Sequence, residues 1–141
     1  MLFGKKKQAP DTPEKSVRVL AVDDEEVIGY IIKRVGRTMG YEVDWVTNCR
    51  DALQSLDSKV YDVILSDFKM PEMNGDAFYR EIAARSEKLL ERLIFISGDT
   101  MNKDTLKFLT TVDVPFLAKP FDIEELKSLM QRTAAGRSNL P

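Results

Sequence analysis

Five short apolar stretches are spaced along the chain, and longer segments in which apolar residues recur at helical spacing separate them. The stretches at residues 17–22, 63–65, 93–96 and 116–118 are apolar at consecutive or nearly consecutive positions. Runs this short and this uniform are typical of strands covered on both faces. At 41–46, in contrast, Glu42 and Asp44 alternate with Val43 and Trp45, which predicts an edge strand.

Each of these strands is followed by a segment with the pattern of an amphipathic helix. The pattern is clearest after the first strand, where the apolar stripe ends at Gly36 and Gly40. Strands that alternate with helices predict a (βα)₅ fold, a doubly wound parallel sheet with helices on both faces, because parallel neighbours need crossover connections. The helical residues expected to face the core are Val27, Ile28, Ile31, Ile32, Val35, Ala52, Leu53, Leu56, Phe78, Ile82, Leu106, Leu109, Ile123, Leu126, Leu129 and Met130.

The composition fits one domain, since 141 residues with 43% hydrophobic content can form a single core. We expect this domain to cover residues 17–133, with a mobile polar tail at 1–16 and a fraying tail at 134–141. The first tail carries three consecutive lysines, Lys5 to Lys7. A short charge run is usually solvated, and contact with acidic lipid or a partner is the alternative.

Several classes of protein are excluded or disfavoured by what the sequence lacks. No apolar run approaches the roughly 20 residues that span a bilayer, and the amino terminus lacks a signal peptide, so a cytoplasmic protein without membrane insertion is expected. The net charge of -2 gives no reason to expect direct nucleic-acid binding, and the single Cys49 cannot form an internal disulfide. The absence of histidine excludes a Ser-His-Asp triad and an internal phosphohistidine.

Functional groups stand at the ends of four of the five predicted strands. Asp23 and Asp24 follow the first, Asp67 ends the third, Ser97 ends the fourth and Lys119 follows the fifth. Each alone has a simpler interpretation as a helix cap, a turn residue or a solvated charge. Since parallel strands end on the same edge of their sheet, the joint pattern predicts one site with three carboxylates, a hydroxyl and an ammonium group.

These residues resemble the receiver domains of bacterial two-component response regulators. The resemblance covers roughly residues 17–133 and includes the pair Asp23-Asp24, the segment SDFKMPEMNG around Asp67, and Ser97-Gly98. It also includes Lys119-Pro120-Phe121, and the run 95–121 is similar to receivers of hybrid histidine kinases. The resemblance implies a flavodoxin-like sheet with strand order 2-1-3-4-5.

The chemistry of the site is consistent with transfer of a phosphoryl group. A carboxylate such as Asp67 can accept one as an acyl phosphate, but crowded acids repel it, so a hard cation such as Mg²⁺ is needed. The resemblance implies that Asp24, Asp67 and the main-chain carbonyl of Lys69 bind the metal, with Asp23 acting directly or through water. Lys119 would pair with Asp67 and later with a phosphoryl oxygen.

The resemblance also assigns roles to neighbouring residues. The Ser97 hydroxyl would donate to the phosphoryl group, and Phe116 would turn inward as a switch, although a plain core phenylalanine is the alternative. The Lys119-Pro120 bond is expected to be cis. We further expect an ion pair between Lys69 and Asp99 over the mouth of the pocket, with an influence on hydrolysis of the acyl phosphate.

The predicted function is a phosphoacceptor in a two-component system or phosphorelay, and not an enzyme with a separate substrate. A sensor histidine kinase or histidine phosphotransfer protein would be the donor, and a downstream target would bind the fourth and fifth helices and the fifth strand. No output domain is expected to follow, so a stand-alone regulator, a relay intermediate and a detached hybrid-kinase receiver stay open, as does the oligomeric state.

Three other classes of function are weaker interpretations. A haloacid-dehalogenase-type phosphatase needs a second acid where this chain has Lys69. A flavodoxin-like flavin carrier would meet four acids after the first strand, which repel the flavin phosphate. The third alternative is a receiver that binds a partner without taking phosphate, and the presence of every expected group disfavours it.

Overall fold

The computed structural model describes residues 16–136, and the predicted tails fall largely outside this range. Five parallel strands form one sheet in the order β2-β1-β3-β4-β5, which confirms the predicted order. The strands are β1 (Arg18–Val22), β2 (Glu42–Val46), β3 (Val63–Asp67), β4 (Leu93–Ser97) and β5 (Phe116–Ala118). The helices are α1 (Glu26–Thr38), α2 (Cys49–Ser58), α3 (Gly75–Arg85), α4 (Lys103–Thr111) and α5 (Ile123–Gly136), with a 3₁₀ helix η1 (Glu87–Arg92) before β4.

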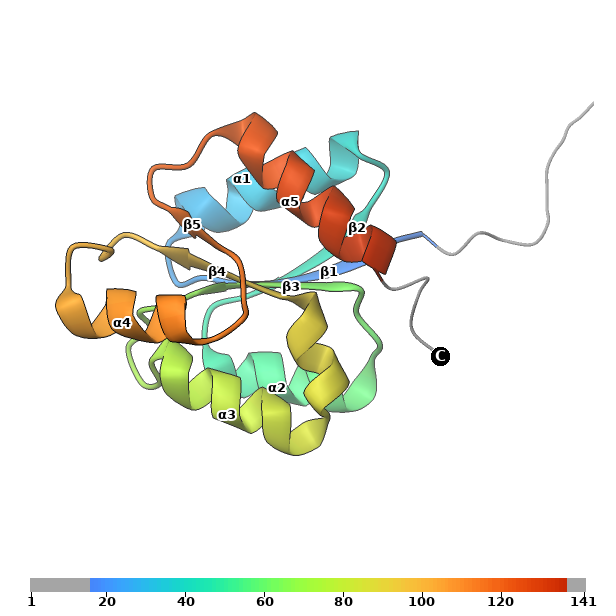
Figure 1. The fold of residues 1–141 in the computed structure, drawn as a ribbon. Coiled ribbons are helices and arrows are strands. Elements are labelled where there is room, and N and C mark those ends of the chain that lie inside the picture. Colours follow the sequence, from blue (N-terminus) through green and yellow to red (C-terminus); the bar gives the residue numbers. More distant parts are fainter. Residues whose placement is uncertain (1–15, 137–141) are drawn as a thin grey trace, which may run out of the picture.

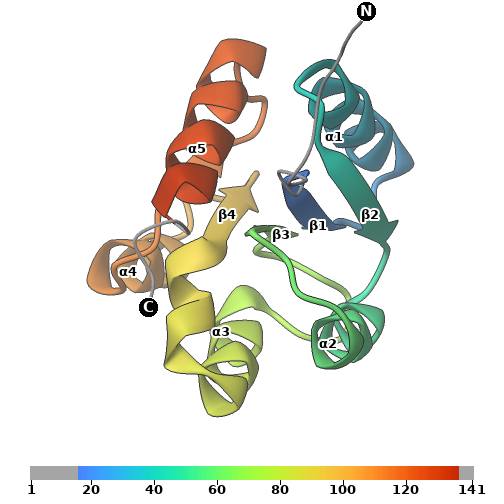
Figure 2. The same cartoon turned by 90° about the vertical axis from the view of Figure 1, so that its right-hand side faces the viewer.

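Helices cover both faces of the sheet, as the uniformly apolar strands predict. Figures 1 and 2 show α1 and α5 over one face and α2 and α3 over the other. Because successive side chains of a strand point to opposite faces, each central strand contributes to two cores. Leu20 and Ile64 pack with α2 and α3, whereas Ala21 and Leu65 pack with α1 and α5.

Three residues expected in the core are exposed instead. Val27 is 68% exposed, Leu106 is 41% exposed and Ile123 is 38% exposed. Val27 lies on the side of α1 opposite the buried Gly29 and Ile32, and Ile123 is the first residue of α5. In α4 the buried positions are Thr105 and Leu109, which share one side of the helix, so Leu106 is rotated toward solvent.

Two elements differ from the predicted boundaries. The 3₁₀ helix η1 was not predicted, and its start is capped by the Ser86 hydroxyl, which accepts a hydrogen bond from Lys88 N at 3.3 Å. Helix α5 continues to Gly136, past the predicted end at 133, because Ala134 is still buried in the core. Within residues 16–136, the helices are all too short or too polar to span a bilayer.

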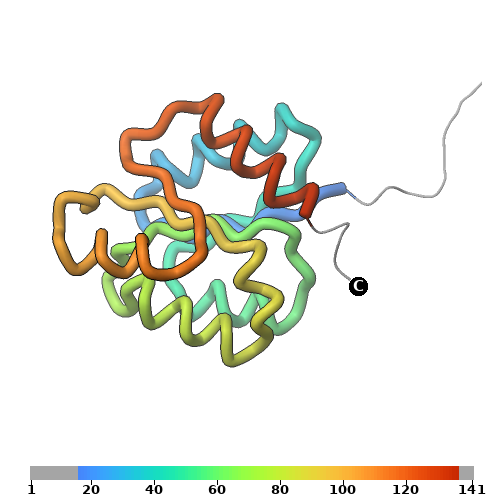
Figure 3. The backbone as a smooth tube through the Cα atoms, viewed as in Figure 1, coloured from blue at the N-terminus to red at the C-terminus, as the bar shows by residue number. Residues whose placement is uncertain are grey.

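The connections that carry functional residues leave the sheet at one edge. The chain passes from β1 to α1, from β3 to α3, from β4 to α4 and from β5 to α5 on the same side of the molecule (Figure 3). This side is the carboxyl edge of the parallel sheet, where ligands bind in open α/β folds.

Candidate functional site

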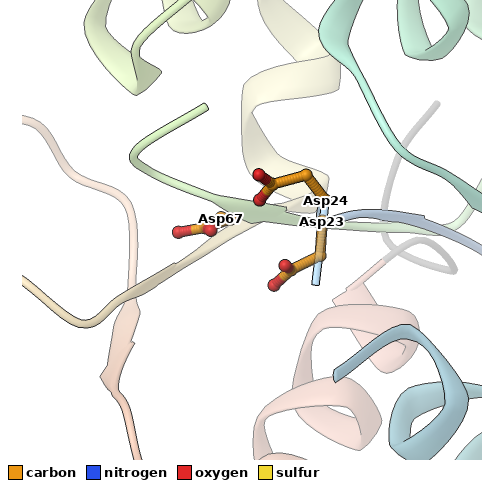
Figure 4. Close-up of side chains that lie close together, drawn as sticks. All are labelled: Asp23, Asp24 and Asp67. Carbon is orange, nitrogen blue, oxygen red and sulfur yellow. The ribbon is translucent and has the colours of Figure 1, made fainter. Parts of the chain in front are cut away.

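The structure brings the predicted acidic residues together at the carboxyl edge. Asp23 and Asp24 follow β1, and Asp67 is the last residue of β3 (Figure 4). One carboxylate oxygen from each of the three lies within 4.8 Å of the others. We refer to Asp23, Asp24 and Asp67 as the acidic pocket.

Lys119 reaches this pocket from the end of β5. Its Nζ lies 3.2 Å from Asp67 Oδ2 and 3.1 Å from Asp23 Oδ2, and it donates a 2.7 Å hydrogen bond to Glu25 Oε1. Its main-chain N donates to Ser97 O at 2.8 Å, and the following bond to Pro120 is cis, as expected. One ammonium group therefore interacts with three carboxylates.

Burial makes these charges unfavourable when no cation is bound. Asp23 is 1% exposed, and burial raises its pKa from 3.8 to about 6, with the charge of Asp67 adding to the rise and the hydrogen bond from Glu25 N opposing it. Burial also raises the pKa of Asp67, although Lys119 opposes the rise. For Lys119, burial lowers the pKa, but the hydrogen bond to Glu25 and the neighbouring carboxylates outweigh it, so its pKa lies above the usual value.

Asp23 is held by contacts from the strand beside it. Its Oδ1 accepts a 2.8 Å hydrogen bond from Glu25 N, and its main-chain N donates to Val46 O at 3.1 Å. The indole Nε1 of Trp45 donates to Asp23 O at 2.9 Å. Gly29 makes room for this indole, since a Cβ there would lie 2.1 Å from Trp45 Cε2. Position 29 therefore has to lack a side chain for Trp45 to reach Asp23.

The loop after β3 is folded back beside Asp67. Lys69 N donates to Asp67 Oδ1 at 3.3 Å, and Phe68 N donates to Ile96 O at 2.8 Å. Gly75 N donates to Phe68 O at 2.6 Å, and a Cβ at Gly75 would lie 2.2 Å from Phe68 Cδ1. The glycine thus lets the start of α3 approach the phosphoacceptor candidate closely.

The remaining predicted residues lie beside the pocket. Ser97 is fully buried, and its Oγ accepts a 3.1 Å hydrogen bond from Asp99 N. Lys69 Nζ and Asp99 Oδ2 form the expected ion pair at 3.0 Å. Phe116 is half-buried against the core that contains Phe95, its neighbour in the sheet. Its role as a switch stays a prediction, as does the main-chain carbonyl of Lys69 as a metal ligand.

The donor atoms of the pocket fit Mg²⁺. Carboxylate oxygens are the ligands that this ion prefers, and three residues offer them at close range. Asp23 Oδ2 is buried without a hydrogen bond, because the contact with Lys119 is an ion pair that lacks hydrogen-bond geometry. A cation in the pocket would interact with this oxygen and reduce the repulsion among Asp23, Asp24 and Asp67.

Glu25 is a site residue that sequence reasoning missed. In the sequence it is one of four consecutive acids, and nothing separates it from its neighbour Glu26. Its side chain is 60% exposed, yet the 2.7 Å hydrogen bond that it accepts from Lys119 Nζ is shorter than the contacts of Lys119 with Asp23 and Asp67. Glu25 differs from Glu26 only in the hydrogen bond that it accepts from Lys119, which extends across the edge of the sheet from the end of β5.

Comparison with known proteins identifies the family. The family model described as response regulator receiver domain matches residues 19–131. The chain belongs to this family. The receiver domain therefore carries an acidic pocket at its carboxyl edge and belongs to two-component signal transduction.

Relatives of this receiver domain come from several kinds of signalling protein. The transcriptional regulatory protein QseB of Escherichia coli O157:H7 is 30% identical over 127 residues, which are 87% of this chain and 57% of that protein. The hybrid signal transduction histidine kinase L of Dictyostelium discoideum is 30% identical over 131 residues, 89% of this chain and 8% of that protein. The chain thus matches only one part of each of these relatives.

A solved structure has the same fold. It is the receiver domain of sensor histidine kinase PA1611 from Pseudomonas aeruginosa PAO1, with a magnesium ion coordinated in its active site cleft. It matches with a TM-score of 0.76 and 29% identity, over 86% of this chain and 99% of that chain.

Proposed function

We propose that Asp67 accepts a phosphoryl group from a phosphohistidine of a partner protein, and that the acyl phosphate changes a surface that binds a downstream protein. The observation that carries this proposal is the position of Lys119 Nζ, 3.2 Å from the buried Asp67 Oδ2 and beside two further carboxylates. A strand-end carboxylate paired with a lysine in an acidic pocket is suited to receive a phosphoryl group, because the lysine offsets the charge that arrives.

The phosphoryl group would pass from the donor imidazole to Asp67 in a single displacement. An oxygen of Asp67 attacks phosphorus, the new O–P bond forms, the N–P bond to the donor imidazole breaks, and the imidazole takes up a proton. Bound Mg²⁺ would supply the positive charge that lets an anionic phosphoryl group enter among Asp23, Asp24 and Asp67. Lys119 would move its contact from Asp67 Oδ2 to a phosphoryl oxygen, and the Ser97 hydroxyl would donate to another.

The donor has to come from outside the chain, since the sequence contains no histidine. A sensor histidine kinase or a histidine phosphotransfer protein fits this requirement. The chain would then act on no separate substrate, and its only reactions would be its own phosphorylation and the hydrolysis of the acyl phosphate.

The output surface is proposed on α4, β5 and α5. Ser97 connects the pocket to the start of the loop before α4 through the hydrogen bond from Asp99 N, and to β5 through the bond from Lys119 N. A phosphoryl group adds about two negative charges at the pocket. It favours a second conformation of the domain only if that conformation binds the phosphoryl group more tightly than the first. Movement of Ser97 toward the phosphoryl group would open space for Phe116.

Phosphorylation itself is tested by incubation with acetyl phosphate and Mg²⁺ followed by intact mass measurement. We expect one added phosphoryl group on the parent chain and none on Asp67→Asn. Asp113→Asn, which removes an exposed acid from the turn between α4 and β5, serves as the matched control and should be labelled normally. Labelling of Asp67→Asn would assign the phosphoacceptor elsewhere, and no labelling of the parent chain would favour a receiver that only binds a partner.

The output surface is tested separately with beryllofluoride and Mg²⁺. Amide chemical shifts should change from the pocket across residues 98–111 and 114–121 and stay nearly constant along α2. Changes confined to the surroundings of Asp67 would leave phosphoryl binding intact and refute the proposed surface.

A further inference from the structure

The peptide group that joins Asp23 to Asp24 lies between two of the three carboxylates of the acidic pocket. Figure 4 shows the two side chains leaving the chain on opposite sides at the end of β1. A peptide group is planar, so a rotation of it changes ψ of Asp23 and φ of Asp24, and with them the directions of both side chains. Asp24 is exposed, so its carboxylate is directed mainly by the main chain. The orientation of this one peptide group therefore affects two candidate metal ligands together.

The sheet ends at this peptide group. Asp23 N donates to the carbonyl of Val46, the last residue of β2, at 3.1 Å. In a parallel pair, the N–H and C=O of one residue bond to the same neighbouring strand, so a longer β2 would supply a main-chain donor to Asp23 O. Because β2 stops at Val46, the donor to Asp23 O is instead the indole Nε1 of Trp45, at 2.9 Å. A side chain thus replaces a main-chain hydrogen bond directly before Asp24.

The indole is held in place by the packing of β2 against α1. Trp45 is half-buried on the core beneath α1 and α5. A Cβ at Gly29 would lie 2.5 Å from Trp45 Nε1, so the ring passes α1 at a position without a side chain. Glycine is among the least favourable residues inside a helix, and the ring is accommodated even though this weakens α1. A buried tryptophan N–H usually finds some acceptor, so it is the identity of the acceptor that indicates a role.

We propose that Trp45 is a positioning residue for Mg²⁺ in the acidic pocket: its indole N–H fixes the Asp23-Asp24 peptide group, so both carboxylates are oriented before the cation binds. The inference rests on the proposed function, since it concerns the Mg²⁺ that phosphoryl transfer would require. Mg²⁺ demands near-ideal octahedral geometry, and loss of a group that orients metal ligands typically lowers metal affinity by roughly 10- to 100-fold. Because the indole contacts the main chain and not a carboxylate, its loss should change the affinity for Mg²⁺ and not the rate of phosphorylation at saturating Mg²⁺.

The test is a Mg²⁺ titration of the parent chain and of Trp45→Phe, followed by the amide chemical shifts of residues 66–69. Phenylalanine keeps an aromatic ring and removes the N–H donor. We expect the Kd for Mg²⁺ to rise about tenfold. A second measurement is made without metal: hydrogen exchange at the amide of Glu25, which donates to Asp23 Oδ1 at 2.8 Å, should be faster in the variant.

Tyr61→Phe is the matched control for a merely structural role. It removes the 2.6 Å hydrogen bond that the Tyr61 hydroxyl donates to Asp44, which precedes Trp45 in β2 and points to the opposite face of the sheet. It should lower stability and leave the Kd for Mg²⁺ unchanged. If Trp45→Phe does not fold, β-(3-benzothienyl)alanine incorporated in place of the single tryptophan keeps the bicyclic shape, lacks the N–H and should raise the Kd likewise.

Phosphorylation separates this inference from the proposed function. With acetyl phosphate, the Mg²⁺ concentration for half-maximal labelling of Trp45→Phe should rise with the Kd, and the rate at saturating Mg²⁺ should equal that of the parent chain. An unchanged Kd in Trp45→Phe, or an equal rise in Tyr61→Phe, would overturn the positioning role and leave the proposed function intact. A parent chain that binds Mg²⁺ but is not labelled would refute the proposed function, while the comparison of Kd values would still decide the role of Trp45. A parent chain that does not bind Mg²⁺ would overturn both.

Discussion

The burial of Asp23 has a measurable effect on stability when no metal is bound. Burial raises its pKa from 3.8 to about 6. A carboxyl group with a raised pKa in the folded state binds its proton more tightly there, so its contribution to stability is full below the unfolded pKa and is lost as the pH rises through the folded pKa. A shift of about two units corresponds to about 3 kcal/mol, because each unit is worth 1.36 kcal/mol.

Asp23→Asn tests this reasoning, since asparagine has nearly the same shape and stays neutral. The free energy of unfolding of the variant should exceed that of the parent chain by about 3 kcal/mol near pH 7, and the difference should be close to zero near pH 3.5. For a domain of this size, the difference near pH 7 corresponds to about 8–12 °C in Tm. Asp44, whose pKa is lowered by its hydrogen bond with Tyr61, has the opposite pH dependence, but it cancels in the comparison.

The assay is urea denaturation of both chains from pH 3.5 to pH 8 in the presence of a chelator, with Asp113→Asn as a control for the loss of one exposed charge. Saturating Mg²⁺ should reverse the sign of the difference, because the parent chain gains binding energy that the variant loses. A difference that does not change with pH, or a variant that is less stable at pH 7 without metal, would show that pairing with Lys119 outweighs the burial of Asp23.

Three further changes test the remaining contacts of the pocket. Glu25→Gln should free Lys119 for the phosphoryl group and tighten beryllofluoride binding by up to about fivefold, since exposed ion pairs are worth about 0.2–1 kcal/mol; unchanged affinity would remove Glu25 from the site. Replacement of both Lys69 and Asp99 by alanine should alter the rate of dephosphorylation, measured by loss of the acyl phosphate, and an unaltered rate would contradict the proposed influence of their ion pair. Asp24→Ala should strongly reduce the rise in Tm that Mg²⁺ causes, whereas an unchanged titration would exclude Asp24 as a ligand.

The fold and the position of the site follow from periodicity, and that is why they could be predicted. Strands buried on both faces carry uninterrupted apolar runs, and parallel strands bring their carboxyl ends to one edge, so the convergence of Asp23 and Asp67 needs no knowledge of side-chain conformations. The contact between Glu25 and Lys119 depends instead on the path of a long flexible side chain. Likewise, the exposure of Val27 follows from the close approach of Trp45 and Val43 to Gly29 and Gly36, which turns the glycine side of α1 toward the sheet.

The chain contains a single tryptophan, Trp45, and its indole N–H donates to the carbonyl of Asp23 at 2.9 Å. The emission of an indole depends on the polarity and the hydrogen bonding around it, so the fluorescence of this protein originates next to the acidic pocket and carries no contribution from other tryptophans. Occupation of the pocket by a metal or a phosphoryl analogue can therefore be followed optically on the natural sequence, in real time and without an attached dye.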